Sequence, residues 1–120
     1  MAKRILIIDD DYDTINLAQK ILELNHFEVL TATERKEALQ ILKNTDIQLI
    51  LLDVLIPKMD GFEFFRAVKQ ELRLEIPVLF FTKTEHLGDP QREDIPAPDG
   101  YIIKPFSAED LIQKVMEYLS

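Results

Sequence analysis

A chain of 120 residues, 47% of them hydrophobic, is long enough to bury its own core and has the composition of one globular domain. Its net charge of -8 argues against direct binding to nucleic acid or to an anionic membrane, and the lack of cysteine excludes disulfides, thiolate metal sites and a cysteine nucleophile. The first apolar run is too short for a signal peptide or membrane helix, so we expect one cytoplasmic domain over residues 1–120.

Short runs of large aliphatic residues without polar alternation predict strands that are buried on both faces of a parallel sheet. Apolar residues at helical spacing lie between these runs. Strands that alternate with helices imply right-handed crossovers and helices on both faces of the sheet. We expect strands at residues 5–8, 27–32, 47–52, 78–81 and 100–103, and helices from about 13 to 25, 34–44, 62–72 and after 107.

Polar residues predict where two of the helices begin. Asp13 or Thr14 is a suitable cap for the first helix, which should stop near Asn25. Ser107, with Asp110 three residues later, resembles a capping box for the last helix, with Asp in place of the usual Glu.

The third aliphatic run, Ile50–Leu52, ends abruptly in Asp53. Aspartate is unfavourable in a strand and in a core, so Asp53 should lie where the strand meets solvent. Open parallel sheets bind their ligands at this carboxyl edge. Taken alone, Asp53 could equally do no more than start a turn toward Pro57.

Polar residues also follow the other strands, namely Asp9, Asp10, Thr82 and Lys104. The carboxyl ends of parallel strands share one edge, so these side chains should gather around Asp53. Two carboxylates ~4 Å apart repel each other by about 4 kcal/mol at an effective dielectric near 20. A hard divalent cation such as Mg²⁺, or the ammonium of Lys104, would offset that repulsion. A carboxylate with cations and a hydroxyl beside it is suited to phosphoryl transfer.

Other interpretations of these residues remain open. Asp9, Asp11 and Asp13 have the spacing with which a calcium loop begins, although the glycine and glutamate expected at its sixth and twelfth positions are absent. Acidic residues are favourable at a helix start, which is the interpretation we prefer for Asp11 and Asp13. Thr82 could be an ordinary strand-end residue, and Lys104 a surface lysine.

Asp9, Asp10, Asp53, Thr82 and Lys104 together resemble the conserved set of the receiver domains of two-component response regulators. Three stretches extend the resemblance to essentially the whole chain: Leu51–Asp53, Pro57–Glu63 and Tyr101–Phe106. The resemblance implies an α/β, three-layer, flavodoxin-like (βα)5 fold with a five-stranded parallel sheet in the order 2-1-3-4-5.

The resemblance also implies roles. Asp53 would be the phosphoacceptor, Asp10 a direct ligand of Mg²⁺ or Mn²⁺, and Asp9 a ligand through water. Asp53 and the backbone carbonyl of Leu55 would complete the protein ligands.

Thr82 would hydrogen-bond one phosphoryl oxygen, and Lys104 would pair with another. The Lys104–Pro105 bond would be cis. Tyr101 matches the aromatic residue that changes rotamer when the threonine moves.

The sequence departs from the family pattern in three places. Lys83 stands where the family has a small residue, so it could narrow access to Asp53 or add positive charge beside the phosphoryl group. Leu55 and Thr84 occupy positions that tune hydrolysis. Residues 83–99 contain three prolines where receivers have a full fourth helix.

Pro90 is tolerated only in a first helical turn, and Ala97 between Pro96 and Pro98 cannot extend a helix. We therefore expect a short or irregular fourth helix, more mobile than the other helices. Output would then not use the family's standard dimer face. A partner would bind the first helix, or order this segment on phosphorylation.

The expected function is a phosphorylation-activated signalling receiver, which is not an enzyme beyond its own phosphorylation and autodephosphorylation. Its partners would be a sensor histidine kinase or phosphotransfer protein, and an output domain or downstream protein, with a possible phosphorylation-dependent dimer.

A phosphorylation-independent pseudo-receiver scaffold is the alternative. An aspartate-nucleophile phosphatase of the haloacid-dehalogenase type fits less well, because Asp13 stands where its motif has threonine or valine and there is no room for a cap domain. A flavin-binding flavodoxin fits least, because no phosphate loop follows the first strand.

Overall fold

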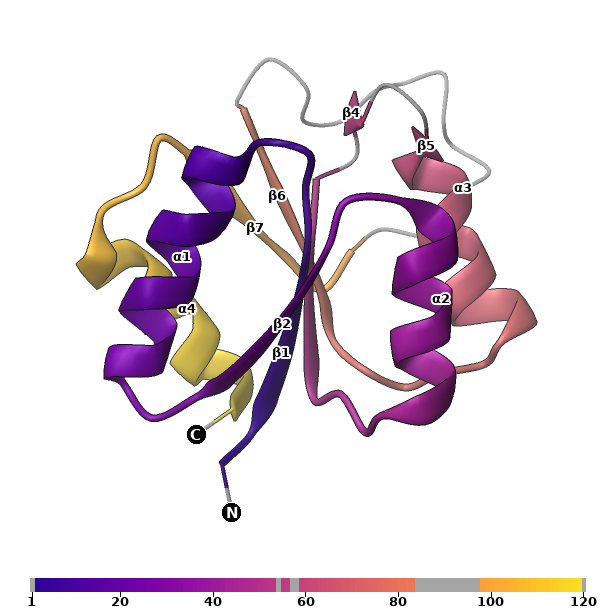
Figure 1. Ribbon diagram of the computed structural model, residues 1–120, viewed down its shortest axis with the longest axis horizontal. Helices are drawn as coiled ribbons and strands as arrows, with labels where there is room; N and C mark the ends of the chain where they lie inside the picture. Colours follow the sequence, from indigo (N-terminus) through magenta and orange to yellow (C-terminus); the bar gives the residue numbers. More distant parts are fainter. Residues whose placement is uncertain (1, 54, 57–58, 84–97, 120) are drawn as a thin grey trace.

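The computed structural model describes residues 2–53, 55–56, 59–83 and 98–119 (Figure 1). At residues 55–56, 59, 71 and 82–83 it describes only the backbone.

A parallel five-stranded sheet runs through the centre of the molecule in the order β2-β1-β3-β6-β7. Taken in chain order, these strands stand in the order 2-1-3-4-5, which confirms the expected topology. A pair of two-residue strands that the sequence did not predict, β4 (Leu55–Ile56) and β5 (Met59–Asp60), forms a separate antiparallel ladder. The central strands are β1 (Arg4–Ile8), β2 (Glu28–Ala32), β3 (Leu49–Leu52), β6 (Val78–Lys83) and β7 (Gly100–Lys104).

Helices cover both faces of this sheet, as the alternating pattern predicted. In Figure 1, α1 (Tyr12–Leu24) and α4 (Ala108–Leu119) lie on one face, and α2 (Arg35–Asn44) and α3 (Gly61–Arg66) on the other. The layers are therefore helix, sheet and helix. Within the described part of the chain, no helix is both long and apolar enough to cross a membrane.

Alternation along the strands divides the core in two. On β1, Ile5 and Ile7 pack in the cluster that faces α1 and α4, whereas Leu6 and Ile8 pack in the cluster that faces α2 and α3. All four side chains are fully buried. This is why the sequence of β1 shows no polar alternation: each face of the strand meets a helix layer.

Helix α1 begins earlier than expected, and its cap is Asp11 and not Asp13 or Thr14. Asp11 has extended backbone angles, and its carboxylate accepts hydrogen bonds from the Asp13 amide at 3.1 Å and the Thr14 hydroxyl at 2.7 Å. Asp13 and Thr14, the two residues expected as caps, therefore donate hydrogen bonds to Asp11, which is the actual cap. The expected cap of α4 is confirmed, because the Asp110 amide donates to the Ser107 hydroxyl at 3.0 Å.

The third helix changes its winding halfway along. After Arg66 it continues as the π-helical segment η1 (Ala67–Glu71), in which the Leu72 amide donates to the Ala67 carbonyl five residues earlier. Lys69 of this segment donates to the Ile76 carbonyl at 2.6 Å and contacts Asp99 at 3.2 Å, which ties the helix end to the starts of β6 and β7.

The prediction of a short or irregular fourth helix concerns residues 84–97, which lie outside the described residues.

Candidate functional site

Two of the predicted site residues stand directly after adjacent strands. Asp9 follows β1, and its amide donates to the Ala32 carbonyl at 3.1 Å; Asp53 follows β3, and its amide donates to the Ile8 carbonyl at 2.9 Å. These bonds continue the ladders by one residue beyond each strand. The sheet therefore fixes the backbone from which both carboxylates extend.

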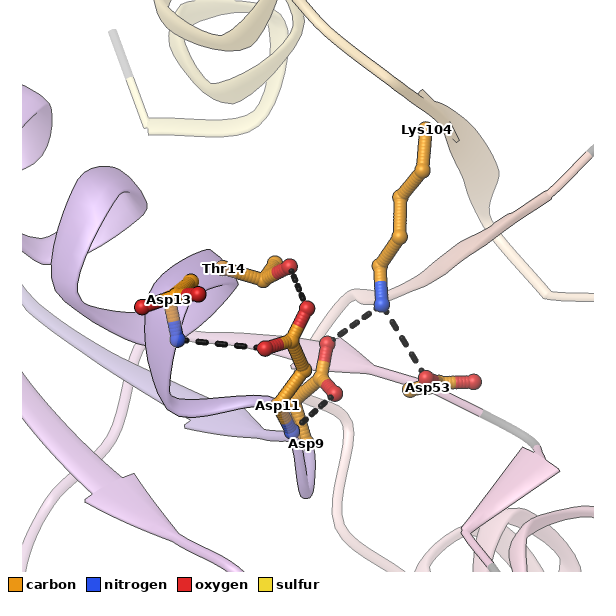
Figure 2. A network of polar contacts seen from close by, with 6 residues as sticks. All are labelled: Asp9, Asp11, Asp13, Thr14, Asp53 and Lys104. Atoms are coloured by element: carbon orange, nitrogen blue, oxygen red, sulfur yellow. Dashed lines mark hydrogen bonds and ion pairs between the residues drawn. The ribbon is translucent and has the colours of Figure 1, made fainter.

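Lys104, at the end of β7, joins the two carboxylates (Figure 2). Its ammonium lies 2.5 Å from Asp9 Oδ2 and 3.0 Å from Asp53 Oδ2. The ammonium also lies 5.0 Å from the centre of the Phe81 ring, within range of a cation–π contact. The side chains of Lys104, Asp9 and Asp53 are 13%, 0% and 12% exposed, respectively, so the network is shielded from solvent but open at one side.

The environment shifts the pKa values of both members of the shortest pair. Burial raises the pKa of Asp9 above its ordinary value, although the hydrogen bond from Lys104 opposes this. For Lys104, burial alone would lower the pKa, but the hydrogen bond to Asp9 and the attraction of Asp9 and Asp53 outweigh it, so the pKa is raised. Lys104 therefore carries its charge throughout the physiological range.

Asp10 completes a group of three carboxylates with Asp9 and Asp53. One oxygen from each lies within 4.8 Å of the others, which is close enough for all three to contact one ion or its bound water. Asp9 and Asp53 are buried and Asp10 is exposed, so the group opens to solvent through Asp10. A set made only of carboxylate oxygens, with one side open to water, fits Mg²⁺ or Mn²⁺ better than softer metals.

Asp11 and Asp13 take no part in this group within the described residues. The Asp11 carboxylate caps α1, and the hydrogen bond from the Thr14 hydroxyl is the main cause that lowers its pKa. The Asp11 amide in turn donates to Asp9 Oδ1 at 3.0 Å, so the start of α1 orients the Asp9 carboxylate (Figure 2). The interpretation of Asp11 as a helix-start residue is thus confirmed.

The remaining predicted residues surround this edge of the sheet. Tyr101 is 36% exposed and packs edge-to-face against Phe80 at 5.9 Å. The Lys104–Pro105 bond is cis, as expected. Thr82 lies in β6 opposite Ile103 of β7, and Leu55 lies in β4; the proposed contacts of the Thr82 hydroxyl and of a metal with Leu55 stay predictions.

The sequence reasoning missed two features of the site. It offered the Lys104 ammonium as a counterion of the clustered carboxylates but did not name Asp9 as the residue that Lys104 contacts, and it gave Phe81 no role beyond the strand. A signal was present: counting by twos from the buried Ile7, Leu51 and Ile102 leads to Asp9, Asp53 and Lys104. All three therefore belong to the same face of the sheet as Phe81.

Known proteins share both the sequence pattern and the fold. The family model described as the response regulator receiver domain matches residues 5–116. The heme response regulator HssR of Staphylococcus saprophyticus is 30% identical over 95% of this chain and 50% of its own length. For the response regulator SaeR of Staphylococcus aureus, the identity is 30% over 97% of this chain and 50% of that protein. The chain therefore spans about half the length of these curated relatives.

Solved structures agree with this match. A CheY-like response regulator receiver domain protein from Methanospirillum hungatei has a TM-score of 0.87 at 32% identity, covering 99% of this chain and 94% of that chain. The chemotaxis response regulator CheY4 of Vibrio cholerae has a TM-score of 0.84 at 27% identity, covering 98% and 99%. With the family pattern matched from β1 to α4, the same strand order and the acidic cluster at the carboxyl edge, the chain belongs to the response regulator receiver domains of two-component systems.

Proposed function

We propose that this chain is a phosphorylation-activated signalling receiver in which Asp53 accepts a phosphoryl group from a phosphohistidine. The donor is a sensor histidine kinase or a phosphotransfer protein. The observation that supports this most strongly is the position of Asp53: it lies at the carboxyl edge of the sheet, one oxygen contacts Lys104 at 3.0 Å, and its side chain remains 12% exposed. A carboxylate in such a place is held by a cation and still reachable by a donor.

The chemistry proposed for Asp53 is a simple displacement. A carboxylate oxygen of Asp53 attacks phosphorus, the phosphorus–nitrogen bond to the imidazole breaks, and the imidazole nitrogen keeps the electron pair and takes up a proton. Lys104 is already beside Asp53, so its ammonium pairs with a phosphoryl oxygen without a large rearrangement. The Thr82 hydroxyl donates to another oxygen, and Tyr101 responds to the movement of Thr82.

Asp9, Asp10, Asp53 and the Leu55 carbonyl are the proposed ligands of Mg²⁺ or Mn²⁺. The bound cation supplies positive charge that neutralises the phosphoryl oxygens. The chain's own contribution is to hold the three carboxylates within 4.8 Å of one another, which is unfavourable without a cation and therefore favours binding one.

The partner of the phosphorylated form is an output domain or a separate downstream protein, with dimerisation as a further possible response. Because the chain carries a net charge of -8, this domain does not itself contact nucleic acid. The proposed location is the cytoplasm. The only chemistry proposed for the chain is its own phosphorylation and autodephosphorylation.

Acetyl phosphate with Mg²⁺ tests this function by intact-protein mass spectrometry. The wild-type chain should gain the mass of one phosphoryl group, with release of acetate, and Asp53→Asn should gain none. Asp46→Asn, which removes an exposed carboxylate at the opposite edge of the sheet, should behave as the wild type. A phosphoryl group on Asp53→Asn would exclude Asp53 as the acceptor. A wild-type chain that gains no mass would favour the phosphorylation-independent scaffold.

A further inference from the structure

On four strands, alternate residues form a column that is buried against α1 and α4, and the same alternation, continued to the carboxyl edge, reaches a charged residue on each strand. The apolar members of the columns are all buried in one cluster: Ile5, Ile7, Leu49, Leu51, Leu79, Phe81 and Ile102. Successive side chains alternate between the faces of a strand, so the next member of each column lies two residues further on. Those members are Asp9 directly after β1, Asp53 directly after β3, Lys83 as the last residue of β6 and Lys104 as the last residue of β7.

The ladder between β6 and β7 places the two lysines at the same level. Phe81 is opposite Ile102, and Lys83 is opposite Lys104. In the sheet order, β6 lies between β3 and β7, so the strand of Lys83 is the direct neighbour of the strand that ends in Asp53. Lys104 reaches Asp53 from one strand further away, past the Phe81 ring.

At this edge, the carboxylates outnumber the cationic side chains that the structure describes. Among the described side chains, the group contains three carboxylates, from Asp9, Asp10 and Asp53, and the ammonium of Lys104 contacts two of them. Without a divalent cation, three negative charges against one positive charge leave an excess of two, which a bound Mg²⁺ would neutralise. A phosphoryl donor is itself an anion, so a further positive charge at this edge favours its approach.

We propose that Lys83 is a second cationic residue of the phosphoryl-acceptor site, which attracts the anionic donor to Asp53 and competes electrostatically with the divalent cation. The inference rests on the proposed function of Asp53 and on the register that sets Lys83 beside Lys104 at the end of the Phe81 column. It has two opposite consequences. Lys83 should raise the rate of phosphorylation by small anionic donors and should lower the affinity of the unmodified chain for Mg²⁺.

Magnesium binding tests the charge at this position without any phosphoryl transfer. Lys83→Met keeps the length of the side chain and removes its charge, whereas Lys83→Arg keeps the charge. For a unit charge and a divalent ion roughly 8 Å apart in a water-like medium, Coulomb's law gives about a fivefold effect on affinity. A titration followed by NMR shifts should therefore show tighter Mg²⁺ binding by Lys83→Met, by about fivefold at low salt, and little change for Lys83→Arg.

The control is Lys43→Met, which removes an equal charge in the last turn of α2, at the opposite edge of the sheet. It should leave Mg²⁺ affinity unchanged. The effect of Lys83→Met should shrink as ionic strength rises, because salt screens interactions between exposed charges. Equal Mg²⁺ affinity in the wild type and Lys83→Met at low salt would overturn the proposal.

Phosphorylation by acetyl phosphate at saturating Mg²⁺ gives the second test. The rate constant should fall several-fold in Lys83→Met and Lys83→Ala and be retained in Lys83→Arg. If Lys83 acted only by narrowing access to Asp53, Lys83→Met would match the wild type and Lys83→Ala would be faster, and this outcome would also overturn the proposal. Failure of the proposed function looks different, since the wild type would then gain no phosphoryl group although Lys83→Met still changes Mg²⁺ affinity.

Discussion

Lys104 and Asp9 are 95 residues apart in the sequence, yet the Lys104 ammonium lies 2.5 Å from Asp9 Oδ2 in a nearly solvent-free pair. The same ammonium holds Asp53 at 3.0 Å. One lysine thus joins the strand that ends in the proposed acceptor to the first strand of the sheet. Its position in the unmodified chain is set by carboxylates that are also proposed to bind the metal.

Removing the Lys104 ammonium should destabilise the fold. Lys104→Met leaves the buried Asp9 and Asp53 without their cation, and breaking a buried pair in this way costs about 3 kcal/mol of the free energy of unfolding. Urea titration should show this loss, and Mg²⁺ should restore part of it by replacing the positive charge. Lys114→Met removes a lysine from a more exposed pair with Glu117 and should change stability little. If Lys104→Met and the wild type are equally stable without Mg²⁺, the ion pairs of Lys104 make no net contribution to the free energy of unfolding.

The contribution of Lys104 to stability should depend on pH in the alkaline range. Its pKa is raised in the folded chain above the ordinary value of 10.5, so the stabilisation is fully present below pH 10.5 and is lost as the pH rises through the raised pKa. The difference in unfolding free energy between wild type and Lys104→Met should therefore be constant from pH 8 to about pH 10 and shrink above it. Taking this difference cancels the titration of the other lysines and tyrosines. A difference that stays constant to pH 12 would contradict the raised pKa.

Asp10 is the exposed member of the carboxylate group, so its replacement should weaken metal binding and change the free energy of unfolding little. Asp10→Asn should weaken Mg²⁺ binding by about tenfold or more, since it removes a charged oxygen ligand. Tyrosine fluorescence or NMR shifts can follow the titration. Asp13→Asn, in the first turn of α1 and outside the group, is the matched control and should bind Mg²⁺ as the wild type does. Unchanged affinity in Asp10→Asn would remove this residue from the ligand set.

Gly100 has no room for a side chain, because a Cβ at this position would lie 2.8 Å from the Tyr118 hydroxyl oxygen. That hydroxyl donates to the Asp99 carbonyl at 2.6 Å and ties α4 to the start of β7. Gly100→Ala should therefore destabilise the chain by about 1–3 kcal/mol through overpacking and a broken hydrogen bond.

A double-mutant cycle tests the cause of that loss. Tyr118→Phe removes the oxygen that clashes, so Gly100→Ala should cost clearly less in the Tyr118→Phe background than in the wild type. Thermal or urea unfolding measures all four proteins. Strict additivity would mean that the clash lies elsewhere, for example with Leu79, whose Cδ2 would be 3.1 Å from the new Cβ.

Periodicity and strand ends were enough to predict a parallel sheet of five strands between two helix layers and the residues of the acidic cluster, whereas the strand order 2-1-3-4-5 came from the resemblance to receiver domains. The reason is physical: a strand buried between two helix layers must be apolar on both faces, as β1 and β3 are, and a charged residue can follow it only where the sheet ends. Asp9, Asp53 and Lys104 could thus be placed at one edge from local pattern alone.

Other features depended on contacts that local pattern does not encode. Asp11, Asp13 and Thr14 are all reasonable caps by composition, and only the extended backbone of Asp11 decides among them. The shift to π-helical winding at Ala67 interrupts a stripe that reads as one regular helix.

The partner of Lys104 was decided by the tertiary structure for a similar reason. Which carboxylate its long side chain reaches depends on the order of β1, β3, β6 and β7 and on the Phe81 ring beneath it, and not on spacing along the chain. Short-range periodicity predicts whether a segment forms a helix or a strand and which of its faces is buried. The distance between residues 95 positions apart is set only when the crossovers bring their strands into one sheet.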